Sequence, residues 1–200
     1  MTRVTGSGLC LLVVLTFLAG IACQLKRPET IPGRMIEPQL LAPQPPERAA
    51  QDTSGAIAAS VRLLDTQARG HIGRRLLHQQ PDGELIEDPV WRWSSAPDRY
   101  LDTALRLELT SSRVLRLVDV ASAPTVAATL LVWHLETGDG TRLVGAVEFQ
   151  VTRTDHVVQT QVVQASETVS ADLPGDLAVA AGRLLRRLAL EGLMRVASER

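Results

Sequence analysis

Apolar and polar residues alternate along much of the second half of the chain, as they do in half-buried β-strands. Between residues 143 and 153, the apolar side chains Val147, Phe149 and Val151 occupy every second position, which places them on one face of a strand. A second apolar run covers residues 126–135, and the loop between the runs reads Thr-Gly-Asp-Gly-Thr. Because such a loop joins antiparallel neighbours, the pattern predicts a hairpin. A further strand is predicted over residues 157–166.

Shorter strands are predicted nearer the N-terminus. Residues 56–64 form an apolar-rich strand candidate, and residues 113–118 alternate basic and apolar side chains. Residues 75–78 and 85–93 flank a Pro-Asp-Gly turn signal. We therefore expect these two segments to pair as a second antiparallel hairpin.

Two segments have apolar residues at helical spacing. In the first, Ser95 is the predicted N-cap and Pro97 falls in the first turn; its apolar residues are Tyr100, Leu101, Ala104, Leu105 and Leu109. The second covers residues 177 to about 197 and has one wide apolar face. That face is formed by Leu177, Ala180, Ala181, Leu184, Leu185, Leu188 and Met194. The predicted fold class is α+β: a mostly antiparallel sheet with two helices packed on one face.

The first residues predict export across a membrane. The basic residue Arg3 precedes a run from Leu9 to Ala22 that contains no charged side chain. This run is too short for a membrane span, which needs about 20 apolar residues. It ends with the small residues Gly20 and Ala22, as a secretory signal does. We therefore predict a signal peptide over residues 1–22.

Cys23 follows this signal directly and resembles the cysteine of a bacterial lipobox, whose thiol is linked to diacylglycerol. Gly20 stands where Leu is usual in that motif. The alternative is an ordinary secretory signal that leaves a free thiol. The other cysteine, Cys10, lies in the removable part, so the mature chain can form no internal disulfide. Lipidation of Cys23 would protect a thiol that an oxidising compartment attacks. By the same resemblance, Gln24 favours sorting to the outer membrane.

A tether is predicted over residues 23–54, and one ordinary domain over residues 55–200. More than half of the chain's 11 prolines fall in the tether, where they favour extended and semi-rigid backbone. The alternative is an N-terminal segment with no specific role.

The charge of the chain argues against several classes of function. There are 21 basic and 22 acidic residues, and one basic residue, Arg3, lies in the predicted signal, so the mature chain is nearly neutral. No basic patch for nucleic acid stands out. The four histidines lack the close spacing of metal ligands. We therefore expect no metal, no cofactor and no nucleic-acid partner.

No residue pattern in the chain indicates catalysis. Ser94 and Ser95 lie close to Asp98 in the sequence, but a helix cap explains this arrangement better than a nucleophile does. The chain has no Gly-x-Ser-x-Gly motif, which serine hydrolases of the α/β class use. We expect a protein that is not an enzyme.

Trp91 and Trp93 are candidates for either the core or a partner surface. On a strand, both side chains face the same side. Trp93 is expected to anchor the core under the following helix. The alternative is an exposed aromatic pair at a partner surface, where Trp is enriched. Pro97 belongs to the same candidate site, and Trp133 on the later hairpin can join either cluster.

The order of several short segments carries a family resemblance. They are residues 71–77, Asp-Gly-Glu-Leu at 82–85, Trp-Arg-Trp-Ser-Ser-Ala-Pro at 91–97, the leucine-rich run 101–105 and Ala-Val-Ala-Ala-Gly at 178–182. Together they resemble the ABC-type transport auxiliary lipoproteins, which include the lipoprotein C component of the paraquat-inducible membrane system. The resemblance covers residues 56–197 together with the signal and lipid site. It departs at Leu77 and His78, where the family commonly has an aromatic residue and Arg, and in the length of the tether.

The resemblance implies a non-catalytic lipoprotein on the periplasmic face of the outer membrane. Such proteins work with an MCE-domain protein and an ABC permease with its ATPase, which together move phospholipids or other hydrophobic molecules across the periplasm. It also implies a homo-oligomer, because a closed ring suits a tunnel-shaped partner, with exposed strand edges as candidate contacts. Two alternatives stay open: a stand-alone periplasmic binding module for a hydrophobic ligand, and an exported serine hydrolase that uses Ser94 or Ser95.

Overall fold

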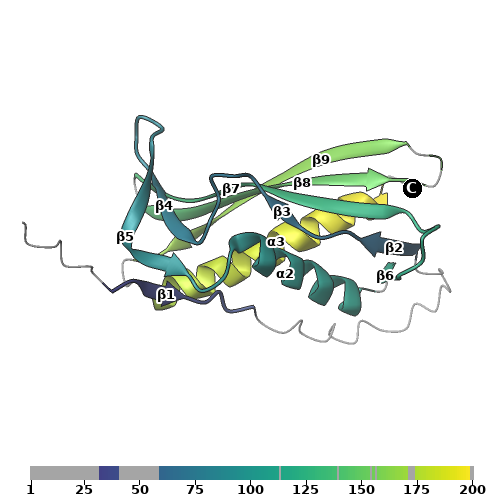
Figure 1. Ribbon diagram of the computed structural model, residues 1–200, viewed down its shortest axis with the longest axis horizontal. Coiled ribbons are helices and arrows are strands. Elements are labelled where there is room, and N and C mark those ends of the chain that lie inside the picture. The colour runs from purple at the N-terminus through teal and green to yellow at the C-terminus, as the bar shows by residue number, and fades with distance from the viewer. Residues whose placement is uncertain are drawn as a thin grey trace, which may run out of the picture. The chain divides into compact units, whose positions relative to one another are not determined.

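A computed structural model describes residues 32–40, 59–112, 114–138, 140–153, 155, 157–170 and 174–198. The predicted signal, Cys23 and most of the predicted tether lie outside these residues. The unit that begins at Gly33 contains one sheet of nine strands and, in its described part, two helices. The fold is therefore α+β, as the sequence pattern predicts (Figure 1).

Three long strands form an antiparallel meander. They are β7 (Thr125–Thr137), β8 (Thr141–Thr152) and β9 (Val158–Val169), and β8 pairs with β7 on one side and with β9 on the other. Gly140 has φ +149° in the β7–β8 turn, a backbone angle that glycine adopts without steric cost. The predicted hairpin and the strand after it are confirmed, and β9 extends to Val169.

The other edge of β7 pairs with three short strands in succession. These are β2 (Ala59–Leu63), β3 (Gln67–Ala68) and β4 (Arg75–Gln79), and all three run parallel to β7. β4 and β5 (Leu85–Trp93) form the second predicted hairpin. β1 (Arg34–Ile36) then pairs parallel with β5. The strand predicted over 113–118 is the short β6 (Leu115–Leu117), parallel to β2.

Both helices cover the same side of the sheet (Figure 1). α2 spans Pro97–Ser111 and buries all five apolar residues that the sequence assigns to its inner face. The prediction that Ser95 is the N-cap is wrong, because Ala96 occupies that position and no side chain caps the helix. The backbone N–H of Ser95 instead donates to the Tyr100 hydroxyl, 2.6 Å away, and Pro97 has no N–H to satisfy.

α3 (Gly175–Ser198) packs on β8 and β9 through small and aliphatic residues. A Cβ added at Gly192 would lie 2.2 Å from the Phe149 ring, so the helix and β8 approach closely here. Six of the seven predicted inner residues are buried, but Met194 is 62% exposed. Within the part of the chain that the structure describes, neither helix is long and apolar enough to cross a membrane.

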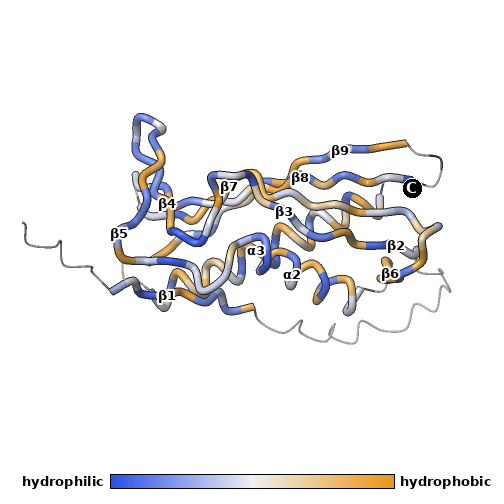
Figure 2. Tube along the Cα trace, in the orientation of Figure 1, coloured by the Kyte–Doolittle hydropathy of each residue, from blue (hydrophilic) through white to orange (hydrophobic). Residues whose placement is uncertain are grey.

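The core lies between the sheet and the helices. Its largest fully buried side chains are Trp93, Phe149 and ten leucines from both helices and the central strands: Leu76, Leu101, Leu105, Leu130, Leu135, Leu143, Leu177, Leu184, Leu185 and Leu188. Hydrophobic and hydrophilic residues alternate along the elements that enclose it (Figure 2). The periodicity that predicts the elements is therefore the pattern of core contacts.

Residues 33–40 pack against the domain that follows. Ile36 is 2% exposed, and the backbone N–H of Gln39 donates to the Ala178 carbonyl, 2.9 Å away. A Cβ at Gly182 would lie 1.9 Å from the Gln39 carbonyl oxygen, so only glycine allows this crossing. This part of the predicted tether 23–54 therefore belongs to the folded unit.

Replacing Gly182 with Ala should lower the free energy of unfolding by about 1–3 kcal/mol, because the new methyl group forces residues 33–40 away from α3. Urea denaturation followed by Trp fluorescence measures this change. The matched control is Gly175→Ala on the same helix, where an added Cβ meets nothing within 4 Å. Equal stability of the two variants would contradict the tight crossing.

Candidate functional site

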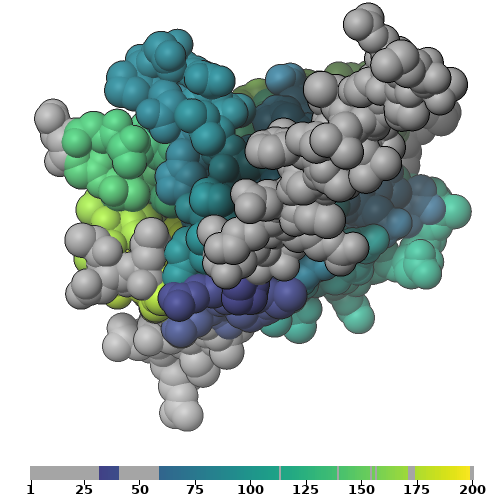
Figure 3. Space-filling model, turned by 60° about the vertical axis from the view of Figure 1, so that its left-hand side comes forward, coloured from purple at the N-terminus to yellow at the C-terminus, as the bar shows by residue number. Residues whose placement is uncertain are grey.

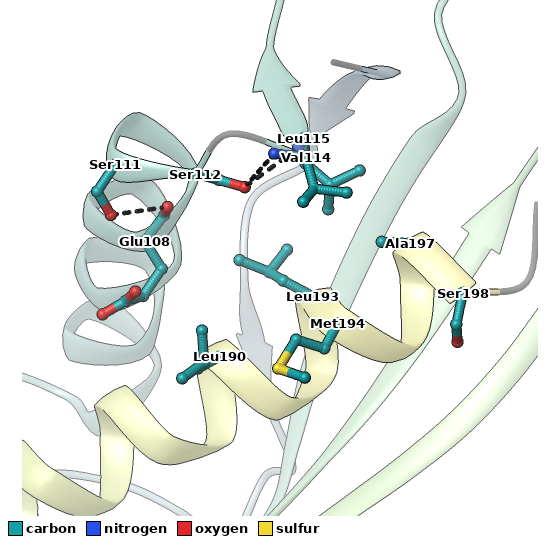
Figure 4. Close-up of a pocket in the computed structure, with 10 residues that line it drawn as sticks. All are labelled: Glu108, Ser111, Ser112, Val114, Leu115, Leu190, Leu193, Met194, Ala197 and Ser198. Carbon is teal, nitrogen blue, oxygen red and sulfur yellow. Dashed lines mark hydrogen bonds between the residues drawn. The ribbon is translucent and has the colours of Figure 1, made fainter. Parts of the chain in front are cut away.

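A groove of about 490 Å³ opens between the end of α2, β6 and the last turns of α3. Figure 4 shows its lining, which consists of Glu108, Ser111, Ser112, Val114, Leu115, Leu190, Leu193, Met194, Ala197 and Ser198. Its floor includes Leu115 and Leu193, which are almost fully buried. Its sides expose apolar atoms to solvent, since Leu190 is 45% and Met194 62% exposed.

The groove exists because α3 continues beyond the end of α2. Arg186, Leu190 and Met194 are spaced four residues apart and lie on one side of α3. Arg186 meets Glu108 in the last turns of α2, at 2.9 Å from Nε to Oε1. α2 ends at Ser111, and among the described residues no element covers Leu190 and Met194 further along the row. This explains why Met194 is exposed although its spacing predicts burial.

The polar groups of the groove have partners within the protein. Ser112 Oγ accepts hydrogen bonds from the N–H groups of Val114 and Leu115, at 3.2 and 3.1 Å, and so fixes the turn from α2 into β6 (Figure 4). Ser111 Oγ donates to the Glu108 carbonyl, 3.1 Å away. The Glu108 carboxylate is paired with Arg186. The groove therefore offers an apolar surface with a neutral rim.

This arrangement suits binding better than chemistry. The volume falls in the range of about 300–1,000 Å³ typical of ligand sites. The only ionisable side chain that lines the groove in the described residues is Glu108, already paired. Among these residues no three His, Cys, Asp or Glu side chains lie close enough to hold a metal ion.

The structure separates the predicted aromatic site into a core part and a surface part. Trp93 is fully buried and its ring lies 5.6 Å from that of Trp133, so these two indoles pack together in the core. Pro97 is buried in the first turn of α2. Trp91 is half-buried at the margin of the core, with the Arg34 guanidinium 5.5 Å from its ring centroid.

Ser94 and Ser95 belong to a hydrogen-bond network around Tyr100. The Tyr100 hydroxyl donates to the Glu37 carboxylate at 2.9 Å and shares a short hydrogen bond with the Ser94 hydroxyl. Burial raises the pKa of Tyr100, the Ser94 hydrogen bond opposes this effect, and Glu37 adds to it. A phenol that keeps its proton cannot activate Ser94 as a general base. The network instead fastens residues 33–40 to the start of α2.

The described histidines have different surroundings. His71 is exposed, His78 Nε2 lies 2.9 Å from Asp88, and the buried His134 has its Nε2 3.5 Å from Glu136; His156 lies outside the described residues. Burial raises the pKa of Asp88, but the N–H groups of Trp91 and Val90 and the His78 side chain lower it by more. The net effect is a lowered pKa, so Asp88 is a structural carboxylate that holds the irregular segment around Pro89.

The groove was not predicted from the sequence. Its residues come from the end of α2, from β6 and from α3, and no short motif joins them. One sequence feature could have indicated the groove. Arg186, Leu190 and Met194 are spaced four residues apart on α3, so two apolar residues follow the arginine that pairs with Glu108. To predict that Leu190 and Met194 are exposed, one must know where α2 ends relative to α3 in the folded protein.

The fold matches solved structures, whereas no protein-family model and no curated protein matches the chain. Protein XCC0632 from Xanthomonas campestris, a DUF330 protein, superposes with a TM-score of 0.61 at 13% identity, over 84% of this chain and 95% of that one. The hypothetical protein CT253 from Chlamydia trachomatis gives a TM-score of 0.53 at 15% identity, over 70% and 96%. A further uncharacterised protein gives 0.58 at 15% identity, over 70% and 91%.

These similarities establish the architecture of the chain. A meander of three long strands, a row of short strands along β7 and two helices on one face define an α+β fold. XCC0632, CT253 and the third protein share this fold at low sequence identity. Similarity at this low identity shows a shared fold but not a shared function. The function therefore has to be argued from the residues of this chain.

Truncating Trp93 to Ala should lower the free energy of unfolding by about 3–5 kcal/mol, because a fully buried ring is lost from the core. Trp91→Ala should cost clearly less, since the Trp91 ring is half-buried. Thermal melts of the two variants measure the difference. Similar losses of stability for both would contradict the separation of the pair.

Stability should fall at alkaline pH through Tyr100. The pKa of Tyr100 in the folded protein is raised above the ordinary value of 10.0. The contribution of the protonated phenol to the free energy of unfolding is therefore fully present below pH 10 and is lost as pH rises through the raised pKa. Tyr100 is the only tyrosine in the chain, so phenolate absorbance reports this group alone. Tyr100→Phe should weaken the decline in stability above about pH 10. A normal titration of Tyr100 in the folded protein would oppose this prediction.

Proposed function

We propose that this protein is a lipid-anchored, non-catalytic docking component of an MCE-type ABC transport system, held at the outer membrane through Cys23. In this role the folded unit binds the MCE-domain partner of the permease and ATPase. The transported molecules are phospholipids or other hydrophobic compounds.

The order of elements supports this proposal. The segments behind the family resemblance form β4, the β4–β5 turn, the end of β5, α2 and the start of α3. All of them belong to one folded unit, and its fold is shared with the DUF330 protein XCC0632.

The observation that carries the docking role is the exposed apolar groove. Val114, Leu190 and Met194 are 62%, 45% and 62% exposed and lie together on its sides. Contiguous apolar surface of this kind marks a contact site on a soluble domain. The carboxylate of Glu108 in the groove is already paired with Arg186. An apolar segment of the MCE-domain partner can therefore bury this surface without leaving a charge uncompensated.

A second copy of the chain has a separate candidate surface at β9. Within the described residues β9 pairs with β8 alone, so its other edge has no partner strand; Arg195 Nη1 donates to the Val162 carbonyl at 3.0 Å. The exposed side chains along β9 are uncharged: Val158, Thr160, Val162, Gln164, Ser166 and Thr168. Edge strands that must stay single usually carry Pro or charged residues, especially Lys. β9 carries neither Lys nor Pro, and its one charged residue, Glu167, is paired with Arg183, which favours a homo-oligomer built through this edge.

A hydrophobic ligand is the second candidate occupant of the groove. The apolar floor of Leu115 and Leu193 can take an acyl chain, and the hydroxyl groups of Ser111 and Ser198 lie at the rim for a polar head. This favours the stand-alone binding module as the alternative function. Native mass spectrometry of the purified protein distinguishes the docking component from the binding module, because only the binding module is expected to retain a lipid.

The docking role predicts loss of the partner when the groove is made acidic. The full chain carrying Leu190→Asp should recover about tenfold less MCE-domain protein from solubilised membranes than wild type, because a charge enters the apolar contact. Ile86→Asp is the matched control, since Ile86 is 44% and Leu190 45% exposed. Intact mass of the same preparations establishes whether Cys23 carries acyl chains.

Two results would contradict the proposal. A lipidated wild-type chain that recovers no MCE-domain protein removes the transport role. A mature chain without acyl chains removes the outer-membrane anchor. Equal recovery with Leu190→Asp and Ile86→Asp would move the docking surface away from the groove.

A further inference from the structure

The place where the folded unit begins limits how far it can lie from the lipid. The described unit starts at Gly33, and Ile36 and Gln39 are already fixed against the core and α3. About ten residues therefore separate Cys23 from this point, and a fully extended chain of that length spans at most ~36 Å. This step rests on the lipid anchor of the proposed function.

The residues beside this starting point form a row across three strands. Met35 on β1 is the register partner of Arg92 on β5, and Arg92 is the register partner of Arg75 on β4. Directly paired residues on neighbouring strands face the same side. Met35 is 64% exposed, and Arg92 and Arg75 are exposed as well. A Cβ at Gly33 would lie 3.2 Å from Arg92 Nε, so this arginine lies directly beside the entry of the chain.

Two arginines opposite each other repel, so the row lowers stability unless an anion compensates for it. Arg75 is paired with Glu87, whereas Arg92 has no charged partner among the described residues. Among the described residues, the carboxylates of Glu37 and Asp88 are already engaged, since Glu37 accepts from Tyr100 and Asp88 bonds His78. Arg92 and the exposed thioether of Met35 thus leave a cationic and apolar surface open. Figure 3 shows the end of the molecule where residues 32–40 lie below β4 and β5.

We propose that this row of Met35, Arg92 and Arg75 rests on the phospholipid surface that carries the anchor. The Arg92 guanidinium binds a lipid phosphate, Arg75 flanks it while paired with Glu87, and Met35 enters the headgroup region. Arginine pairs with phosphate through two parallel hydrogen bonds, and each cation gains attraction near an anionic leaflet. The short connection to Cys23 keeps the row within reach of that surface. The β1 end of the domain therefore faces the membrane.

The test uses the full lipidated chain in vesicles of phosphatidylethanolamine and phosphatidylglycerol that contain a nitroxide-headgroup lipid. A fluorescent label is attached to Met35→Cys or, as a control, to Thr160→Cys at the start of β9, where the side chain is also exposed. Lipid-linked Cys23 cannot react with the label. Quenching at position 35 should clearly exceed quenching at position 160, because only position 35 lies at the lipid headgroups in this arrangement.

Charge reversal then tests the arginine itself. Arg92→Glu in the Met35→Cys background should remove most of the excess quenching, and Arg116→Glu on β6 should leave it unchanged. Equal quenching at positions 35 and 160 in a chain with its acyl chains overturns the membrane-facing row but leaves the docking role intact. Unchanged quenching at position 35 in the Arg92→Glu variant would also overturn the membrane-facing row. A chain that lacks acyl chains overturns both the row and the anchored function.

Discussion

The close packing of α3 against its two neighbours is the constraint on which the rest of the structure depends. On one side the helix meets β8, where added methyl groups at Gly192 and Gly145 would collide with the Phe149 ring and with Leu188. On another side it meets residues 33–40, where Gly182 leaves room for the Gln39 backbone. Small residues let backbone and helix come together, so contacts that are individually weak sum over a large area. The sheet, the N-terminal segment and α2 are all positioned by this one helix.

The groove follows from the same helix, because α3 is longer than the elements that cover it. The ion pair between Glu108 and Arg186 marks the last point where α2 accompanies α3. Beyond it Leu190 and Met194 continue the row of Arg186 along α3, are not covered by α2, and are exposed. Single exposed aliphatic side chains are common on folded proteins, but Leu190 and Met194 lie together with Val114 along one groove. Contiguous apolar surface of this kind favours binding as the explanation.

Local patterns predicted most of the fold, and the three-dimensional contacts decided the remainder. Alternation at Val147, Phe149 and Val151 reported β8 correctly, because half-burial imposes period two on any strand. The same reasoning missed the parallel pairing of β2, β3 and β4 with β7, since strand order depends on contacts between distant segments. The periodicity of α3 assigned Met194 to the core, because no sequence pattern records where a neighbouring helix ends. Of the candidate site, Trp93 was expected in the core and Pro97 was left as a candidate for either core or partner contact, whereas the groove was not predicted.

The arginine-containing row and the apolar groove lie at opposite ends of α3, which bears on how the domain would be oriented in the proposed function. The row of Met35, Arg92 and Arg75 lies where the chain enters the folded unit, near the N-terminal end of α3, because Gln39 bonds Ala178. The groove lies around Met194 at the other end of that helix. Sixteen residues of α-helix separate Ala178 from Met194, which corresponds to about 24 Å along the axis. In the proposed function, a lipid on Cys23 would hold the end beside β1 near the bilayer, and the apolar groove would project away from it. A docking protein requires this arrangement, because its partner approaches from the side opposite the membrane to which it is anchored.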